Sequence, residues 1–364
     1  MGSFLRFFTW PAIAGVLAAL LILQQWVLPT PSPEGAAVAR DSFRQAVASA
    51  TPSVVNIYTE KRVASANSRM LNNPFMPIPR GAPRQRVERS LGSGVIMREN
   101  GYILTNNHVI DGADAIQVLL SDGRSAAAQV VGLDRATDLA ALKVDLEDLS
   151  AISIADSDRL SVGDVVLAIG NPLGFGHSVT QGIVSGLGRF GLSPGSYEGF
   201  IQTDAVIHAG NSGGALVDVN GALVGINSWI YASSEGNSGG SVGIGISLAI
   251  PSSFADFVMD DLIRFGRVIR GWLGVQVEQI PGDGPGDQRL LVRGVAVDGP
   301  ADRAGLQAGD IITHLNDEAV EDVRLAMYEV SLLRPGDRLM LSASRDGEAV
   351  ELTAIIGTQP ETTE

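Results

Sequence analysis

A serine within a run of small residues most constrains what this 364-residue chain can fold into. Ser212 lies in Ala209-Gly210-Asn211-Ser212-Gly213-Gly214-Ala215-Leu216. The glycines let the backbone turn tightly and leave amide N–H groups free to face a negative charge that develops on a carbonyl oxygen. A serine hydroxyl is a poor nucleophile until a base removes its proton, so this run requires partners elsewhere in the chain.

Two upstream segments supply those partners. His108 lies in Thr105-Asn106-Asn107-His108-Val109, and Asp138 lies in Ala136-Thr137-Asp138-Leu139-Ala140. The chain order is therefore base, carboxylate and nucleophile, which is the His…Asp…Ser order of the chymotrypsin-type double β-barrel. Each residue alone has an ordinary explanation: a structural histidine, an aspartate that caps a turn, or a glycine-rich hairpin. Together, each beside a strand-like run, they predict a catalytic triad.

Composition excludes several other kinds of chemistry. His177, His208 and His314 show no metal-binding spacing, and the chain has no cysteine, so we expect neither a metal nor a cofactor. Without cysteine there can be no disulfide or thiolate chemistry. The net charge of −14 disfavours nucleic acid as a partner, because phosphate binding needs a basic face.

The middle of the chain reads as a series of short β-strands separated by turns. The apolar and β-branched runs are residues 54–58, 94–97, 116–120, 139–144, 165–169, 179–187 and 223–230. This rhythm predicts two antiparallel barrels with the triad in the cleft between them. We expect a helix over residues 41–50, ended by Pro52, and a second helix over 253–265 that links two folded units. Residues 64–89 and 231–241 read as long irregular segments, the second near the substrate pocket.

A second β-rich module begins at Arg270-Gly271-Trp272-Leu273-Gly274-Val275. Within it, the run from Gly299-Pro300-Ala301-Asp302 to Gly309-Asp310-Ile311-Ile312 resembles a PDZ domain, and a single such domain is expected. A PDZ domain binds a peptide C-terminus as an added strand, and here the loop Trp272, Leu273, Gly274 and Val275 would receive the carboxylate. The alternative is a module that only packs on the protease and limits access to it.

The motifs together resemble the HtrA/Deg family of serine proteases, from about residue 43 to about residue 356. The matching runs are Leu91-Gly92-Ser93-Gly94-Val95-Ile96, Gly101-Tyr102-Ile103-Leu104-Thr105-Asn106, Gly163-Asp164-Val165-Val166, Ala168-Ile169-Gly170-Asn171-Pro172 and Gln202-Thr203-Asp204-Ala205. The chain departs from the family at His208-Ala209, where Asn-Pro is common, and at Leu248, where Phe is common. The first departure touches the backbone before the nucleophile, and the second touches the region that shapes the specificity pocket.

The resemblance implies a cofactor-free serine endopeptidase. His108, Asp138 and Ser212 would be catalytic, and the segment Gly210, Asn211 and Ser212 would form the oxyanion hole. An arginine at the position of Arg189 carries an activation signal in the family. One PDZ domain with an N-terminal anchor is similar to the DegS-like branch. Such a protease cleaves a membrane anti-sigma factor in a stress response, when its PDZ domain binds C-termini of misfolded outer-membrane proteins, and it acts as a homotrimer.

The N-terminus carries an apolar segment over residues 7–28, preceded by Arg6 and followed by no acidic residue before Glu34. We expect a single-pass anchor in the bacterial inner membrane, with Trp10 and Trp26 near the two interfaces. The expected organisation is a cytoplasmic tail over 1–6, the transmembrane signal anchor over 7–28, a linker over 29–42, a trypsin-like protease domain over 43–265 and a PDZ domain over 270–358. The last two would lie in the periplasm.

Two alternatives remain open from the sequence. The run Ala37-Val38-Ala39 is an A-x-A site, so the segment could be a cleaved signal peptide. The product would be a soluble periplasmic quality-control protease and chaperone resembling the DegQ-like branch. The other alternative is a catalytically inactive PDZ adaptor that only binds peptide C-termini.

Overall fold

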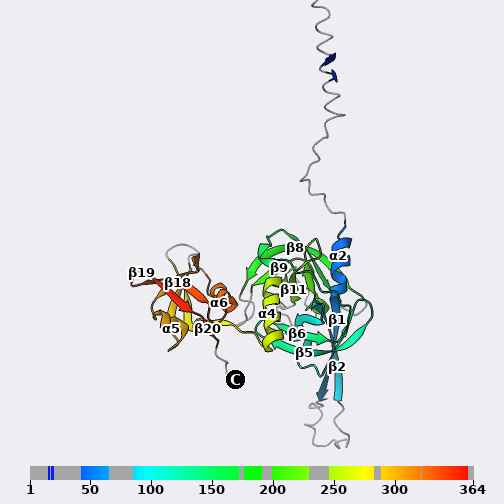
Figure 1. The fold of residues 1–364 in the computed structure, drawn as a ribbon, viewed down its shortest axis with the longest axis horizontal. Coiled ribbons are helices and arrows are strands. Elements are labelled where there is room, and N and C mark those ends of the chain that lie inside the picture. Colours follow the sequence, from blue (N-terminus) through cyan, green and yellow to red (C-terminus); the bar gives the residue numbers. More distant parts are fainter. Residues whose placement is uncertain are drawn as a thin grey trace, which may run out of the picture. The chain divides into compact units, whose positions relative to one another are not determined.

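The computed structural model describes residues 15–16, 18–19, 42–64, 85–171, 176–190, 199–228, 246–282, 288–320 and 322–359. Residues from Arg44 onward belong to one compact unit (Figure 1). Of the predicted anchor, only residues 15–16 and 18–19 are described, and these are helical. The predicted tail, the rest of the anchor and all of the linker except its last residue lie outside the described residues. In the described part of the chain, no helix is long and apolar enough to cross a membrane.

The first barrel places the predicted base beside the predicted carboxylate. Its antiparallel strands follow the closed order β1-β2-β3-β6-β5-β4. In the pairing of β3 with β6, Asn106 lies opposite Leu139, so the residues just beyond this pair, His108 and Asp138, come together. The strands are β1 (Val54–Ala64), β2 (Gln85–Arg98), β3 (Tyr102–Asn106), β4 (Ala115–Leu119), β5 (Ser125–Asp134) and β6 (Leu139–Val144), with the short helix α3 (Asn107–Ile110) after β3.

The second barrel carries the predicted nucleophile, and the two-barrel prediction is confirmed. Its closed order is β10-β11-β12-β9-β8-β7. A 3-10 turn, η3 (Ala209–Asn211), precedes Ser212, and β10 begins three residues after it. The strands are β7 (Val165–Gly170), β8 (Ser178–Arg189), β9 (Phe200–Thr203), β10 (Ala215–Val217), β11 (Leu223–Ser228) and β12 (Ser247–Pro251), and the 3-10 turn η2 (Ser157–Arg159) precedes β7.

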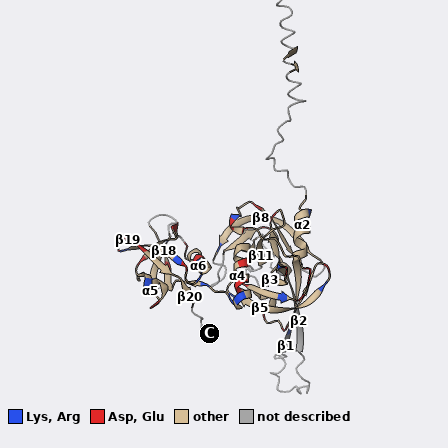
Figure 2. Ribbon diagram, in the orientation of Figure 1, with Lys and Arg blue, Asp and Glu red and all other residues tan. Residues whose placement is uncertain are grey.

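Two helices flank the barrels where the sequence predicts them. Helix α2 (Arg44–Ala50) runs into the 3-10 turn η1 (Thr51–Ser53), which contains Pro52. Helix α4 (Ser252–Phe265) follows β12 and ends at Gly266, whose φ of 71° suits glycine and whose N–H donates to the Leu262 carbonyl. The acidic residues of α4 are visible in Figure 2, and two of them, Asp256 and Asp260, pair with Arg98 at 2.7 and 2.9 Å.

The strands β1 and β2 are longer than the sequence predicts. Residues 64–89 were expected to be irregular, yet β1 continues to Ala64 and β2 begins at Gln85, with these two residues paired. Charged residues dominate this part of both strands, so it lacks the apolar run that marks a buried strand. Backbone pairing between the two arms of one hairpin forms these strand ends without a hydrophobic signal.

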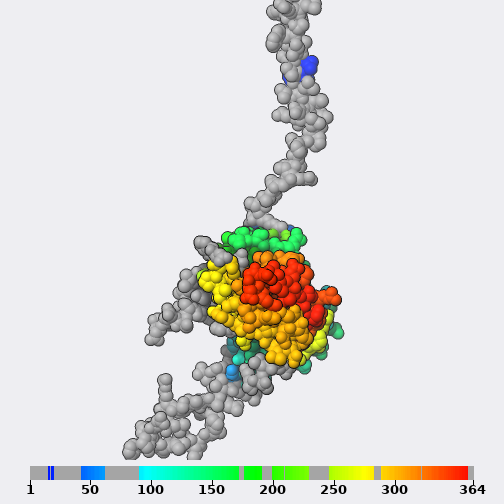
Figure 3. All heavy atoms as spheres, turned by 90° about the vertical axis from the view of Figure 1, so that its left-hand side faces the viewer, coloured from blue at the N-terminus to red at the C-terminus, as the bar shows by residue number. Residues whose placement is uncertain are grey.

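The C-terminal module has the predicted PDZ architecture. Its main sheet has the order β14-β15-β16-β18-β19, with β17 paired to β16, while β13 pairs with β20. Figure 3 turns the side of this module that carries α5 and β19, in orange to red, toward the reader. The elements are β13 (Gly271–Trp272), β14 (Val275–Pro281), β15 (Gln288–Val295), α5 (Pro300–Ala304), β16 (Ile311–Leu315), β17 (Glu318–Ala319), α6 (Val323–Leu332), β18 (Arg338–Arg345), β19 (Glu348–Ile355) and β20 (Gly357–Thr358).

An ion pair between Asp310 and Arg345 stabilises this module beside its core. Arg345 binds both oxygens of the Asp310 carboxylate, at 2.8 and 2.7 Å, and the Gln307 N–H donates to it at 2.8 Å. The Asp310 side chain is 2% exposed. The hydrogen bond from Arg345 lowers the pKa of Asp310 from its ordinary value of 3.8. The pair therefore contributes its full stability above that value, and this contribution is lost as the pH falls through the folded-state pKa.

We expect Asp310→Asn to destabilise the module, because the Arg345 guanidinium loses its ionised partner. Hydrogen–deuterium exchange should become faster in β16 and β18 at neutral pH and stay unchanged in the first barrel. Lowering the pH below 3.8 and through the folded-state pKa of Asp310 should reduce this difference, because wild-type Asp310 then also loses its charge. Equal exchange protection in both proteins at neutral pH would contradict this role for the pair.

Candidate active site

His108 and Asp138 form a directly bonded pair. The His108 Nδ1 atom lies 2.6 Å from Asp138 Oδ2, and the His108 N–H donates to Asp138 Oδ1 at 2.9 Å. An ionised carboxylate only accepts hydrogen bonds, so it binds Nδ1 in its protonated form and leaves Nε2 free to take a proton. The His108 side chain is 42% exposed and that of Asp138 is 19% exposed, so the imidazole remains accessible to a substrate.

The backbone of Asp138 is fixed by the same short segment. Its φ is 56°, a left-handed conformation that aspartate tolerates better than most residues. The Asp138 carbonyl accepts hydrogen bonds from the Asn107 N–H at 2.9 Å and from the Asn106 side chain at 3.1 Å. Residues on both sides of the β3–α3 junction therefore hold the carboxylate under the imidazole.

A backbone hydrogen bond to Ser93 holds Ser212, while the Ser212 hydroxyl forms no hydrogen bond with the described residues. The Ser212 side chain is buried. The following residue, Gly213, has a φ of 79°, and a Cβ there would lie 2.2 Å from the Ser93 carbonyl oxygen, so only glycine fits. The structure thus joins His108 to Asp138 but shows no bond from Ser212 to His108. Catalytic hydrogen bonds are often long in a free enzyme and shorten when substrate binds.

The backbone before the nucleophile forms a tight turn. The Asn211 N–H donates to the His208 carbonyl at 2.8 Å and is therefore occupied within the turn. The Gly210 N–H has no backbone acceptor among the described residues. The Ser212 N–H follows the 3-10 turn η3, whose i→i−3 pattern directs it toward the Ala209 carbonyl. Within the predicted oxyanion segment, the Gly210 N–H is therefore the donor that this arrangement leaves open. His208 and Ala209, where the sequence departs from the family that it resembles, form the first part of this turn.

In the part of the chain that the structure describes, no group of three or more His, Cys, Asp or Glu side chains could hold a metal ion. His177 instead contacts the Val54 carbonyl at 2.8 Å, and His314 contacts Thr313 at 3.1 Å.

Arg189 lies at the end of β8, where it bonds to a neighbouring strand. Its Nε donates to Gln202 on β9 at 2.9 Å. The next residue, Phe190, packs edge-on against Tyr328 of α6, with ring centroids 5.9 Å apart. Tyr328 also contacts Phe254 of α4 at 5.1 Å. Burial, and then the charge of Asp158, raise the pKa of Tyr328, so the ring stays neutral in this apolar contact.

A groove lies between β14 and α6 of the PDZ module. Its volume is about 420 Å³, and its apolar lining includes Leu290, Ile312 and Met327. The predicted loop Trp272, Leu273, Gly274 and Val275 lines one end of it. Gly274 has a φ of 79°, which favours glycine, and a Cβ there would lie 3.1 Å from the Trp272 ring, a tight contact. Because β14 is an edge of the sheet, its free side can accept an added strand.

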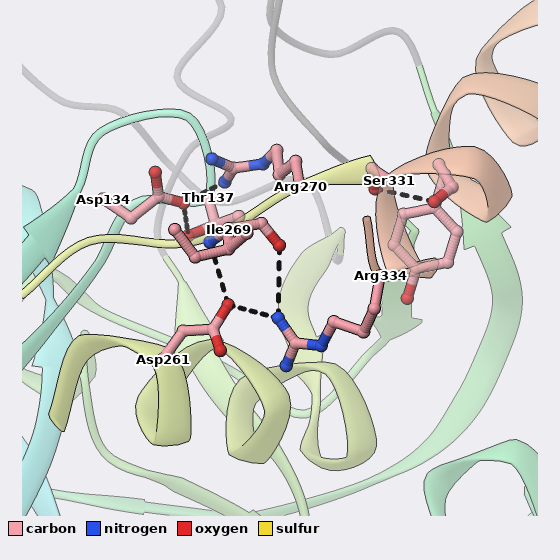
Figure 4. Close-up of polar contacts among 8 residues, drawn as sticks. Asp134, Thr137, Asp261, Ile269, Arg270, Ser331 and Arg334 are labelled. Atoms are coloured by element: carbon pink, nitrogen blue, oxygen red, sulfur yellow. Dashed lines mark hydrogen bonds and ion pairs between the residues drawn. The ribbon is translucent and has the colours of Figure 1, made fainter. Parts of the chain in front are cut away.

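The sequence did not identify a set of polar contacts that join the PDZ module to the protease (Figure 4). Arg270 pairs with Asp134, whose carboxylate also accepts a hydrogen bond from Thr137 at 2.5 Å. Arg334 pairs with the buried Asp261 at 2.6 Å. Asp134 and Thr137 belong to the turn that leads directly into Asp138. The charges are far apart in the sequence, so no local pattern could have paired them.

Comparison with known families and proteins agrees with this geometry. The trypsin-like peptidase domain family matches residues 92–226, and the PDZ domain family matches residues 271–356. A protein from Marinomonas sp. (strain MWYL1), named probable periplasmic serine endoprotease DegP-like, is 41% identical over 342 residues, which cover 87% of this chain and 71% of that protein. A protein of the same name from Brucella suis biovar 1 (strain 1330) is 41% identical over 288 residues, covering 76% of this chain and 55% of that protein.

Two solved structures are similar to this chain over most of its length. The HtrA-type protease AlgW with decapeptide is 45% identical, with a TM-score of 0.70, and the match covers 88% of this chain and 100% of that one. The serine endoprotease from Yersinia pestis is 39% identical, with a TM-score of 0.60, and covers 92% of this chain and 100% of its own.

Proposed function

The chain belongs to the HtrA/Deg family of periplasmic serine endoproteases, and we propose that it is a stress-sensing regulatory member of that family. In this proposal it cleaves a membrane anti-sigma factor when its PDZ domain binds C-termini of misfolded outer-membrane proteins. The observation that carries the proposal is the direct contact of Phe190, next to Arg189, with Tyr328 on α6. A peptide in the groove contacts α6, so its binding can change the contact of Tyr328 with Phe190, the residue after β8.

The catalytic assignment within this proposal is acyl transfer by His108, Asp138 and Ser212. His108 Nε2 takes the proton of the Ser212 hydroxyl as Oγ attacks the scissile carbonyl, while Asp138 holds the imidazole and stabilises its charged form. The N–H groups of Gly210 and Ser212, within the predicted oxyanion segment that includes Asn211, stabilise the oxyanion, and each is worth about 3 to 4 kcal/mol. His108 then protonates the leaving amine, and water hydrolyses the acyl-enzyme to restore Ser212.

The same proposal includes the domain boundaries, the anchor and the assembly expected from the sequence. The protease domain spans 43–265, the PDZ domain spans 270–358, and residues 7–28 anchor the chain in the inner membrane with both domains in the periplasm. Holding enzyme and membrane substrate on one surface raises their effective concentration. Assembly into a homotrimer through the segment just after the anchor completes the proposal.

We expect fractionation of cells to find the full-length chain in the inner membrane, resistant to high-salt extraction, because an apolar anchor is not released by screening charges. N-terminal sequencing should recover residues before Arg40. A soluble periplasmic chain that begins at Arg40 would contradict the anchor.

That contrary result would select the second candidate, a soluble quality-control protease and chaperone resembling the DegQ-like branch. The Ala37-Val38-Ala39 site and the DegP-like names of the curated relatives favour it. The inactive-adaptor alternative is disfavoured by the bonded His108–Asp138 pair beside an accessible imidazole edge.

A further inference from the structure

Ser93 is a buried serine for which the catalytic assignment has no role. It lies on β2 in the run Leu91-Gly92-Ser93-Gly94, and its exposed fraction is 0%. A fully buried hydroxyl needs hydrogen-bond partners, and those of Ser93 lie at the candidate active site.

Two of its hydrogen bonds hold the nucleophile segment on both sides of Asn211. The Ser93 N–H donates to the Ser212 carbonyl at 2.9 Å. The Ser93 hydroxyl donates to the Gly210 carbonyl at 2.7 Å. The Asn211 N–H between them is already bound to His208, so each end of this short turn is fixed by Ser93.

Two further hydrogen bonds join Ser93 to both barrels. Its Oγ accepts from the Asn171 N–H, just after β7 of the second barrel, at 2.9 Å. Its carbonyl accepts from the Thr105 hydroxyl, on β3 of the first barrel, at 2.7 Å. The catalytic groups are divided in the same way, since His108 and Asp138 belong to the first barrel and Ser212 to the second. Ser93 therefore contacts both the barrel that carries His108 and Asp138 and the barrel that carries Ser212.

We infer that Ser93 is a positioning residue for the oxyanion hole, through the bond from its hydroxyl to the Gly210 carbonyl. Glycine has wide conformational freedom, so an unrestrained Gly210 could turn the peptide that joins it to Asn211 and so change the direction of its own N–H relative to that of Ser212. The hydroxyl anchors this peptide before substrate arrives, and such preorganisation of the donors is what oxyanion stabilisation depends on. This inference rests on the proposed catalytic roles of Ser212 and of the Gly210 N–H.

The test compares Ser93→Ala with wild type by steady-state hydrolysis of a fluorogenic peptide and by inhibition with a peptide boronate. Boron bonds to Ser212 Oγ and becomes tetrahedral, so one of its hydroxyls occupies the oxyanion position. We expect kcat to fall by about 10- to 100-fold, less than for loss of a donor itself, while KM changes by less than about twofold. The affinity for the boronate should fall in parallel with kcat, because both report stabilisation of the tetrahedral state.

Two other variants separate positioning from folding. Ser93→Thr keeps the hydroxyl and should recover activity to within about threefold of wild type. Ser252→Ala is the matched control, because Ser252 is also fully buried and its hydroxyl donates to the Ala155 carbonyl at 2.8 Å. It should lower thermal stability about as much as Ser93→Ala and leave kcat unchanged. If Ser93→Ala does not fold, Ser93→Cys, with its weakly donating thiol, provides the same comparison.

The inference is overturned if Ser93→Ala keeps kcat within about threefold of wild type, or if kcat falls without a loss of boronate affinity. It is equally overturned if Ser93→Thr is as impaired as Ser93→Ala, since the hydroxyl is then not responsible. These outcomes are distinct from failure of the catalytic assignment, which would show as cleavage that survives Ser212→Ala.

Discussion

Replacing Ser212 with alanine should lower kcat/KM for peptide cleavage by about 10⁴- to 10⁶-fold and leave the fold intact. Alanine lacks the atom that attacks the carbonyl, and it is smaller than serine, so it fits the buried position. The Ser212 hydroxyl has no hydrogen bond to lose among the described residues, so the change breaks no contact that the structure shows. Hydrolysis of casein or of a fluorogenic peptide measures the loss.

His108→Ala should lose a similar amount, and the double variant should lose no additional factor, because the triad acts as a unit. Serine-directed inhibitor on the wild type provides the matching chemical control. Circular dichroism and thermal melting should show that both variants stay folded. Residual cleavage within about tenfold of wild type would reject the assignment and favour another nucleophile or the adaptor alternative.

The pairing of His108 with Asp138 could be predicted because it follows from strand register. His108 follows the apolar run that forms β3, and Asp138 precedes the apolar run that forms β6. Antiparallel pairing of β3 with β6 brings these two strand ends together. The unengaged state of the Ser212 hydroxyl could not be predicted. It depends on a side-chain rotamer and on a turn held by Ser93, a residue more than a hundred positions away in the sequence.

The double barrel was predicted from repeated apolar runs and the PDZ module from its resemblance to that domain, but several strands were not predicted. Strand β9 (Phe200–Thr203) and strand β10 (Ala215–Val217) are too short to show a periodic pattern, and the strand β5 (Ser125–Asp134) begins in an alanine-rich run. These strands form because they pair with neighbouring strands that have clear apolar runs. The contacts of Arg270 with Asp134 and of Arg334 with Asp261 join sites far apart in the sequence, which only the tertiary fold brings together.

The second large effect concerns regulation, and its physical basis is the position of α6. Val330 and Met327 line the peptide groove, while Tyr328, between them in the sequence, packs against Phe190 and Phe254 of the protease. One helix therefore touches both the bound peptide and the residue next to Arg189. A peptide can raise activity only if it binds the active arrangement more tightly than the inactive one.

We expect peptides with hydrophobic C-termini to stimulate cleavage by roughly 5- to 150-fold, which corresponds to a coupling of about 1 to 3 kcal/mol. Deletion from Gly271 onward should remove the response and keep some basal activity, because His108, Asp138 and Ser212 all lie before that residue. The assay is the rate of peptide hydrolysis as the activating peptide is titrated. Binding of the same peptide to the full chain is measured separately by fluorescence anisotropy.

Arg189→Ala should reduce the stimulation without weakening peptide binding, because the Arg189–Gln202 bond lies at the end of β8 and outside the groove. Arg124→Ala is the matched control, since Arg124 is also an exposed arginine with several hydrogen bonds, but all of them lie within the first barrel. It should leave both binding and stimulation unchanged. If peptides bind and the rate does not rise, binding does not distinguish the two arrangements, and the contact of α6 with Phe190 transmits no signal. The PDZ domain would then serve as a docking site that brings substrates to an enzyme of fixed activity.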